Sequence, residues 1–231
     1  MRVHMQTAGS GPPIVCTPGI GKTADDWAVL SAELAGQHTV VTWDLLGHGK
    51  SPVPEEPSEY TRDRALDDLD DVITAALTPD SSAPLVLLGH SLGGYLTLAW
   101  RATRSTLPHP PLAAMVVMAT GPGFRDDAKR EAWNDRSRRN AHRFGVPLQA
   151  AELNLQEDGV VIQKVPEMDL PVLVVVGSED RADIQGGCGY LAAKLPNARL
   201  VTIEGGDHLM HEDPAHAAAI ATAVQEFLAA V

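Results

Sequence analysis

The pentapeptide Gly89-His90-Ser91-Leu92-Gly93 places a serine between two glycines in the pattern G-x-S-x-G. In this pattern the serine occupies a strained turn between a strand and a helix, with its hydroxyl exposed above the sheet. The glycines are needed because side chains at positions 89 and 93 would collide with neighbouring backbone. An apolar run over 84–88 precedes the turn and a helical pattern follows it. These features favour Ser91 as a nucleophile at a helix N-terminus over a chance glycine-rich turn.

A serine hydroxyl is a weak nucleophile at neutral pH, so it needs a base and a group that orients the base. For this motif the acid follows the serine along the chain, and the histidine follows the acid. The segment 177–180 comes directly after an apolar run, which would put a carboxylate at the active edge of the sheet. We expect Asp180 to be the acid. Glu179 and Asp183 stay open as alternatives, as does a solvated acidic turn, because a short loop could present any of the three carboxylates.

The base is expected in the glycine-rich segment 205–208, which leaves a predicted strand and can carry a histidine back across the sheet edge. His208 is the predicted base, and His211 and His216 are alternatives that lie nearer the last helix. The cluster of His208, His211, Glu212 and His216 also suggests a metal site. It lacks the HExxH spacing and a clear third ligand, so we expect neither a metal nor another cofactor.

Two backbone N–H groups must stabilise the negative charge that develops on the substrate oxygen. Leu92, directly after the nucleophile, is expected to supply one. The segment 17–21 follows an early predicted strand, and Ile20 within it is expected to supply the other; a plain turn is the alternative there. The glycine-rich segment 43–51 lacks the spacing of a phosphate-binding loop, so we interpret it, including Asp44, as a structural turn.

Short apolar runs alternate with helical patterns, which predicts an α/β fold with a mostly parallel central sheet flanked by helices. The predicted strands are apolar runs typical of strands buried on both faces: residues 14–16, 39–43, 85–88, 113–118, 172–176 and 200–203, with 3–7 as an outer antiparallel strand. The predicted helices span residues 26–34, 62–77, 92–101, 189–195 and 215–228. We expect a single domain over 1–231, with 124–169 inserted as a short cap that begins with a charged helix at 126–143.

Charge excludes several classes of partner. The 231 residues include 18 basic and 30 acidic residues, for a formal net charge of −12. This charge repels nucleic acid and anionic membranes, so we expect a small-molecule substrate. The sequence contains neither a long uncharged apolar run nor the N-terminal pattern of a secretory signal. Two widely separated cysteines, Cys16 and Cys188, are typical of a reducing compartment. We therefore expect a cytoplasmic monomer or homodimer.

Three segments together resemble the α/β-hydrolase superfamily, and the resemblance covers nearly the whole chain: GHSLGG at 89–94, DLLGHGKS at 44–51 and GDHLMHEDP at 206–214. Their order and spacing are similar to the esterase and lipase-like branch. The resemblance implies Ser91, Asp180 and His208 as a catalytic triad, with Ile20 and Leu92 as oxyanion donors. The chain departs from the family in having Pro18-Gly19 in place of His-Gly, one N-terminal strand instead of two, and a short cap. A short cap implies an open, shallow or promiscuous pocket, or closure by a second subunit.

The expected cap is basic within an acidic protein and carries seven cationic residues: Arg125, Lys129, Arg130, Arg136, Arg138, Arg139 and Arg143. It resembles the cap entry of menaquinone-pathway enzymes that eliminate pyruvate from an anionic cyclohexene substrate. That likeness implies that Arg138 and Arg139 bind a substrate carboxylate, whereas the alternative is a solvated helix paired with its own acidic residues. Trp133 is the tryptophan expected in the pocket. The leading hypothesis is a serine hydrolase acting on a small ester or thioester. The alternatives are a lyase that uses the triad as a base and a non-catalytic ligand-binding protein.

Overall fold

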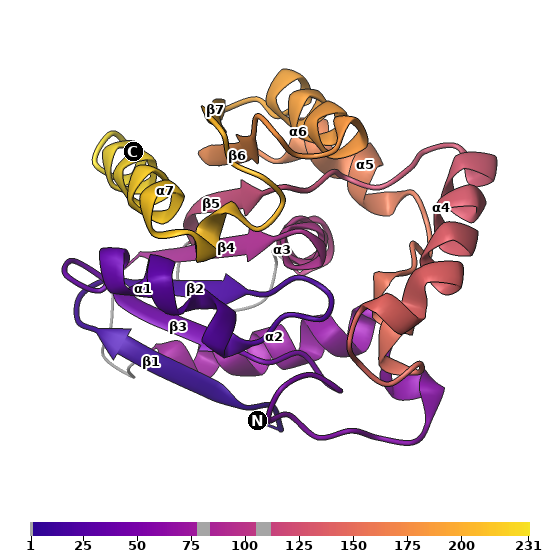
Figure 1. Ribbon diagram of the computed structural model, residues 1–231. Coiled ribbons are helices and arrows are strands. Elements are labelled where there is room, and N and C mark those ends of the chain that lie inside the picture. Colours follow the sequence, from indigo (N-terminus) through magenta and orange to yellow (C-terminus); the bar gives the residue numbers. More distant parts are fainter. Residues whose placement is uncertain (1, 78–83, 105–111) are drawn as a thin grey trace.

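The computed structural model describes residues 2–77, 84–104 and 112–231, and within these residues seven strands form one sheet. The strand order is β1-β3-β2-β4-β5-β6-β7, and only β1 runs antiparallel to its neighbour (Figure 1). The strands are β1 (Met5–Gly9), β2 (Pro13–Thr17), β3 (Thr39–Trp43), β4 (Leu85–His90), β5 (Leu112–Met118), β6 (Val172–Gly177) and β7 (Ala198–Ile203). The predicted mostly parallel α/β fold is therefore confirmed.

Two details of the predicted strands are wrong. The outer strand begins at Met5 instead of residue 3 and continues to Gly9. The last strand was expected to be buried on both faces, yet Leu200 in the middle of β7 is 43% exposed. The reason is its place in the sheet, because among the described strands β7 lies at the edge and pairs with β6 alone. An apolar run alone does not distinguish a central strand from an edge strand.

Seven α-helices lie in the described residues: α1 (Ala28–Leu34), α2 (Arg62–Ala76), α3 (Leu92–Thr103), α4 (Asp127–Asn140), α5 (Val160–Lys164), α6 (Ala182–Lys194) and α7 (Pro214–Leu228). The side chains of Thr61, Asp126 and Asp213 accept backbone N–H groups at the starts of α2, α4 and α7. The predicted start of α6 at residue 189 is wrong. This helix begins seven positions earlier, at Ala182, and continues through three glycines. No helix among the described residues is long and apolar enough to cross a membrane.

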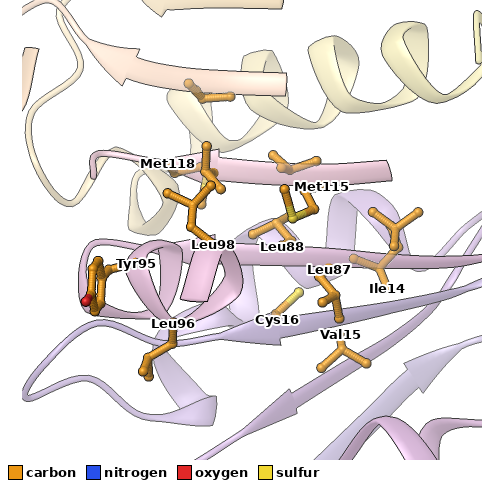
Figure 2. Packing of buried hydrophobic residues seen from close by; sticks show 14 of the residues in the cluster. Ile14, Val15, Cys16, Leu87, Leu88, Tyr95, Leu96, Leu98, Met115 and Met118 are labelled. Carbon is orange, nitrogen blue, oxygen red and sulfur yellow. The ribbon is translucent and has the colours of Figure 1, made fainter. Parts of the chain in front are cut away.

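The core lies between the central strands and the helices that cover them. Figure 2 shows Val15 of β2, Leu87 of β4 and Met115 of β5 packed as neighbours in the middle of the sheet. Leu98 of α3 packs among side chains of the same strands. Burying a side chain of this size stabilises the fold by about 1.5–3 kcal/mol. The packing of α3 against β4 and β5 therefore positions the turn that joins β4 to α3.

The segment 124–169 lies beyond the carboxyl ends of β4 and β5, where α4 stands apart from α1 and α7 (Figure 1). Its first half is α4 followed by a 3-10 turn at Ala141–Arg143, and its second half contains α5. Arg62 at the start of α2 donates two hydrogen bonds to Asp158, at 2.8 and 3.0 Å. Asn134 of α4 exchanges hydrogen bonds with the backbone of Gln156. The Arg62–Asp158 bonds thus tie the cap segment (124–169) to α2, and the Asn134–Gln156 bonds join its two halves.

Candidate active site

Ser91 occupies the turn between β4 and α3 with a φ of 53°, which is unusual for a residue with a side chain. The two flanking glycines explain how the turn is possible. A Cβ on Gly89 would overlap the carbonyl oxygen of Gly93, and a Cβ on Gly93 would overlap the carbonyl oxygen of Thr17. The turn is therefore packed against its own helix and against the end of β2, with the serine at the helix N-terminus.

The end of β5 supports the same turn. The Ser91 N–H donates to the Met118 carbonyl at 2.9 Å, and the Thr120 hydroxyl donates to the Ser91 carbonyl at 2.8 Å. Thr120 was missed by the sequence analysis, although it is the first hydroxyl-bearing residue after an apolar strand that ends beside β4. These two hydrogen bonds hold the backbone of the strained residue from its neighbouring strand.

Ser91, His208 and Asp180 are brought together in a hydrogen-bonded series. The His208 Nε2 lies 3.1 Å from the Ser91 Oγ, and its Nδ1 lies 2.9 and 3.1 Å from the two carboxylate oxygens of Asp180. A carboxylate can only accept, so Nδ1–H donates to Asp180 and Nε2 is left to accept from the Ser91 hydroxyl. This tautomer is the one that a general base acting on the serine requires.

Burial distinguishes Asp180 from the two other carboxylates considered in the sequence. The Asp180 side chain is completely buried and also accepts the Arg181 N–H at 2.7 Å. Asp183 instead pairs with Arg181 at 3.1 Å and with Arg136 of α4 at 3.0 Å. Glu179 is exposed. Among the three, Asp180 is the carboxylate that contacts His208.

The alternative histidines lie elsewhere. His216 pairs with Asp213 at 3.4 Å at the start of α7, so it belongs to the helix end. His211 is buried with its ring against Trp27, and burial lowers its pKa to about 4. Within the described ranges no group of three or more histidine, cysteine or acidic side chains could hold a metal ion. The geometry thus separates His208 from its neighbours.

The segment 17–21, called the oxyanion loop below because the sequence predicts an oxyanion donor within it, passes close to Ser91. A Cβ on Gly19 would lie 3.2 Å from the Cβ of Ser91. Ile20 and Leu92 both line the cavity above Ser91. Among the described residues, neither of their N–H groups donates a hydrogen bond within the protein. Whether both donate to a substrate oxygen stays a prediction of the sequence.

Asp44 lies outside this arrangement. Its buried carboxylate accepts the N–H groups of Ala24 and Lys50, at 2.6 and 2.7 Å. Its carbonyl accepts the Ser51 hydroxyl at 2.7 Å. These bonds stabilise the glycine-rich turn after β3, as the sequence predicted.

A cavity of about 340 Å³ opens over Ser91. The apolar side chains that line it come from the core and from the cap: Ile20, Leu92, Tyr95, Phe124, Trp133, Phe144, Ile184 and Leu209. The rings of Phe124 and Trp133 lie 5.8 Å apart, and the Trp133 indole N–H donates to the Asn154 carbonyl at 3.1 Å. Trp133 is thus held in the cavity wall by the second half of the cap.

The expectation that Arg138 and Arg139 face this cavity is wrong. Neither residue lines it, and both are exposed on α4. Arg138 pairs instead with Glu131 at 3.3 Å and with Asp135 at 3.7 Å on its own helix. The physical reason is the rotation of α4, which turns Trp133 and Asn134 inward and leaves positions 138 and 139 toward solvent.

Two other cations, Lys22 and Arg181, line the cavity, and neither was predicted from the sequence. Lys22 pairs with Glu212 at 2.7 Å, and Arg181 pairs with Asp183. No motif distinguishes either residue in the sequence; each lies one or two positions from a residue that was predicted. Each has a carboxylate partner, but Asp183 is shared between Arg181 and Arg136.

Comparison with known proteins gives one consistent result. A model described as "Alpha/beta hydrolase family" matches residues 14–222. A pimeloyl-[acyl-carrier protein] methyl ester esterase of Xanthomonas axonopodis is 26% identical in an alignment that covers 99% of this chain and 100% of that protein. An uncharacterized protein of Mycobacterium tuberculosis is 29% identical over 126 residues, which are 54% of this chain and 34% of that protein. The chain thus spans about a third of the length of this mycobacterial relative, in contrast to the esterase from Xanthomonas.

Among solved structures, a thermophilic esterase from Thermogutta terrifontis superposes with a TM-score of 0.79 at 20% sequence identity. The superposition covers 98% of this chain and 92% of that one. At this identity the likeness shows a shared fold.

Proposed function

Because the chain belongs to the alpha/beta hydrolase family, we propose that it is a serine hydrolase that cleaves a small carboxylic ester or thioester through an acyl-enzyme. The observation that carries this proposal is the hydrogen-bonded series from buried Asp180 through His208 to Ser91. The esterase from Xanthomonas, aligned over its full length, supports an ester as the substrate class.

In the proposed reaction, His208 accepts the Ser91 proton while Oγ attacks the carbonyl carbon of the ester. Asp180 stabilises the imidazolium that forms, and the N–H groups of Ile20 and Leu92 donate to the oxyanion. His208 then gives its proton to the leaving alcohol or thiol, and the C–O or C–S bond breaks. A water molecule deprotonated by His208 releases the acid and restores the serine.

The substrate is proposed to be uncharged near the reacting carbonyl. The walls above Ser91 are mostly aromatic and aliphatic, and the cationic groups Lys22 and Arg181 already have acidic partners. The arginines that suggested an anionic substrate for the lyase alternative lie on the solvent side of α4. A series of p-nitrophenyl esters of increasing acyl length tests this proposal. We expect kcat/KM to rise until the 340 Å³ cavity is filled and then to fall.

Trp133 gives a matched test of which wall limits the acyl group. Replacing Trp133 with alanine should increase the preferred acyl length, because the indole forms the part of the cavity wall that the cap supplies. The same chain-length optimum in W133A and wild type would argue against an acyl site at this wall.

The first experiment compares hydrolysis of p-nitrophenyl butyrate by wild type and by Ser91→Ala. Turnover that is lost in the variant, together with a burst of p-nitrophenol and labelling of Ser91 by a fluorophosphonate, is the expected result. Labelling without ester turnover would favour the lyase alternative, in which the triad acts as a base. Absence of both would favour a ligand-binding protein.

A further inference from the structure

His90, the residue before the nucleophile, contacts the backbone of the base. Its Nε2 lies 2.7 Å from the carbonyl oxygen of His208. A carbonyl oxygen can only accept, so Nε2–H of His90 donates this bond and the neutral ring carries its lone pair on Nδ1. His90 is 1% exposed. The bond therefore joins the β4 end to the loop that carries His208 inside the protein.

The surroundings keep this ring neutral. Burial holds the pKa of His90 well below its usual range, and His211, His208 and Lys22 nearby oppose a further positive charge. The rings of His211 and His208 lie 4.3 and 5.0 Å from the His90 ring, centre to centre. Nδ1 has no hydrogen-bond partner among the described residues. The ring is thus a fixed donor toward the His208 carbonyl.

Other hydrogen bonds hold the loop of His208 on both sides of the base, including one from the Leu209 N–H to the Asp207 carboxylate at 2.8 Å. The loop leaves β7 through Gly205, whose φ is 70°, and Gly206. At that end the Gly205 N–H donates to the Ser178 hydroxyl at 2.8 Å, the Glu179 N–H donates to the Gly206 carbonyl at 2.9 Å, and the Gly206 N–H donates to the Ile203 carbonyl at 3.1 Å. In the described part of the chain, His90 is the hydrogen-bond partner of the His208 carbonyl itself.

We propose that His90 is a positioning residue, whose Nε2–H holds the His208 backbone so that the imidazole spans from Asp180 to Ser91. The inference rests on the proposed function, since it assigns His90 a part in the same reaction. A donor attached next to the nucleophile fixes the base relative to the serine, and both move together with the end of β4. Loss of the donor should lower the fraction of molecules in which His208 lies within reach of the serine hydroxyl.

The matched variants are His90→Gln and His90→Met, because the two side chains have similar length and shape but only glutamine can donate. We expect H90M to lower kcat for p-nitrophenyl butyrate on the order of 10- to 100-fold, with KM changed by less than about twofold. The rate of fluorophosphonate labelling should fall in parallel. H90Q should retain activity within about fivefold of wild type.

His48 supplies the control for a merely structural loss. It is also a buried histidine that donates to a backbone carbonyl, that of Leu46 at 3.0 Å, and it does not line the cavity. H48M should lower the thermal midpoint while leaving kcat per folded molecule unchanged. Equal kcat in H90M and wild type would overturn the proposal, as would equal impairment of H90Q and H90M.

A failure of the proposed hydrolase function would give results different from a failure of the positioning role of His90. If wild type neither hydrolyses esters nor reacts with the fluorophosphonate, the hydrolase assignment fails while positioning is still testable by nitrogen-15 NMR of the histidines. The expected spectrum shows His90 as the Nε2–H tautomer and sharp His208 signals that broaden in H90M but not in H90Q. His208 signals that are the same in all three proteins would overturn the inference.

Discussion

Replacing Asp180 with asparagine is the most informative single change, because asparagine has almost the same shape and removes the negative charge. In the native site both carboxylate oxygens accept from His208 Nδ1, at 2.9 and 3.1 Å, and Oδ1 also accepts the Arg181 N–H at 2.7 Å. Asparagine can supply one acceptor and one donor group to the same two partners. Either orientation of the amide therefore disrupts one of these interactions.

If the amide oxygen keeps the Arg181 N–H, the NH₂ group faces His208 and stabilises the tautomer with the proton on Nε2. That tautomer cannot accept the Ser91 proton. If the amide is reversed, its NH₂ meets the Arg181 N–H in a fully buried site, at a cost of about 1–3 kcal/mol. A wrong tautomer in a serine triad lowers kcat on the order of 10³- to 10⁴-fold. This corresponds to about 4–5.5 kcal/mol of transition-state stabilisation.

The assay is kcat for p-nitrophenyl butyrate, with thermal unfolding to correct for the folded fraction. Glu179→Gln and Asp183→Asn are the comparison variants, since their carboxylates do not contact His208. Asp183 takes part in ion pairs that are half-exposed and worth about 0–1 kcal/mol each, so D183N should lose less than tenfold. Asp180 is not the triad acid if D180N keeps more than about a tenth of wild-type kcat, or if E179Q or D183N loses as much kcat as D180N does.

Four further changes test the supporting structure. Gly93→Ala forces a Cβ into the backbone of the oxyanion loop, so it should lower the free energy of unfolding by about 3 kcal/mol and remove most of the activity. Gly186→Ala adds a Cβ in open space on α6 and should raise the free energy of unfolding by up to ~1 kcal/mol. Urea unfolding of the two variants and of wild type measures both changes. Arg62→Met removes the two hydrogen bonds to Asp158 and should lower the free energy of unfolding by about 1–2 kcal/mol, which the same titration measures; no change would mean that this pair does not anchor the cap. Burial lowers the pKa of His211 to about 4, below the value of about 6.5 expected in the unfolded chain. Between about pH 6.5 and pH 4 the unfolded chain therefore binds a proton that the folded protein does not. The free energy of unfolding should fall with decreasing pH in this range, by up to about 3 kcal/mol. His211→Phe should remove that part of the slope in unfolding titrations at pH 7, 5.5 and 4.5, and an unchanged slope would contradict the assignment.

Much of the site was predictable because parallel strands bring their carboxyl ends to one edge of the sheet. Ser91, Asp180 and His208 follow three different apolar runs, so their meeting requires only that the runs form neighbouring or nearby strands of one sheet. The two glycines that flank Ser91 independently indicated a tight turn, since the close approaches at positions 89 and 93 leave no room for a side chain. What the sequence left open was the choice among adjacent carboxylates, which depends on side-chain direction within a turn of four residues.

The rotation of α4 within the segment 124–169 was not predictable from the sequence. A helix with charge on nearly all sides has no apolar stripe from which its rotation can be read. In α4 the inward face carries Trp133, Asn134 and Ser137, and two of these three are polar. They are buried because Gln156 and Asn154 in the second half of the cap supply hydrogen-bond partners. Such pairing is specified by tertiary contacts between distant residues, which composition and periodicity do not describe.

The oxyanion loop shows how a departure from the family pattern is compatible with the site. The expected histidine is replaced by Pro18, but the close contacts of the loop are made one residue later. A Cβ on Gly19 would lie 3.0 Å from the His90 ring and 3.2 Å from the Ser91 Cβ, and the Gly19 carbonyl accepts the Lys22 N–H at 3.1 Å. The path of the loop is thus constrained by its approach to the nucleophile turn and by its own hydrogen bond, so a donor at position 20 does not depend on the side chain at position 18. The same His90 ring lies against Gly19 and bonds the His208 carbonyl, which places one buried side chain between the oxyanion loop and the base.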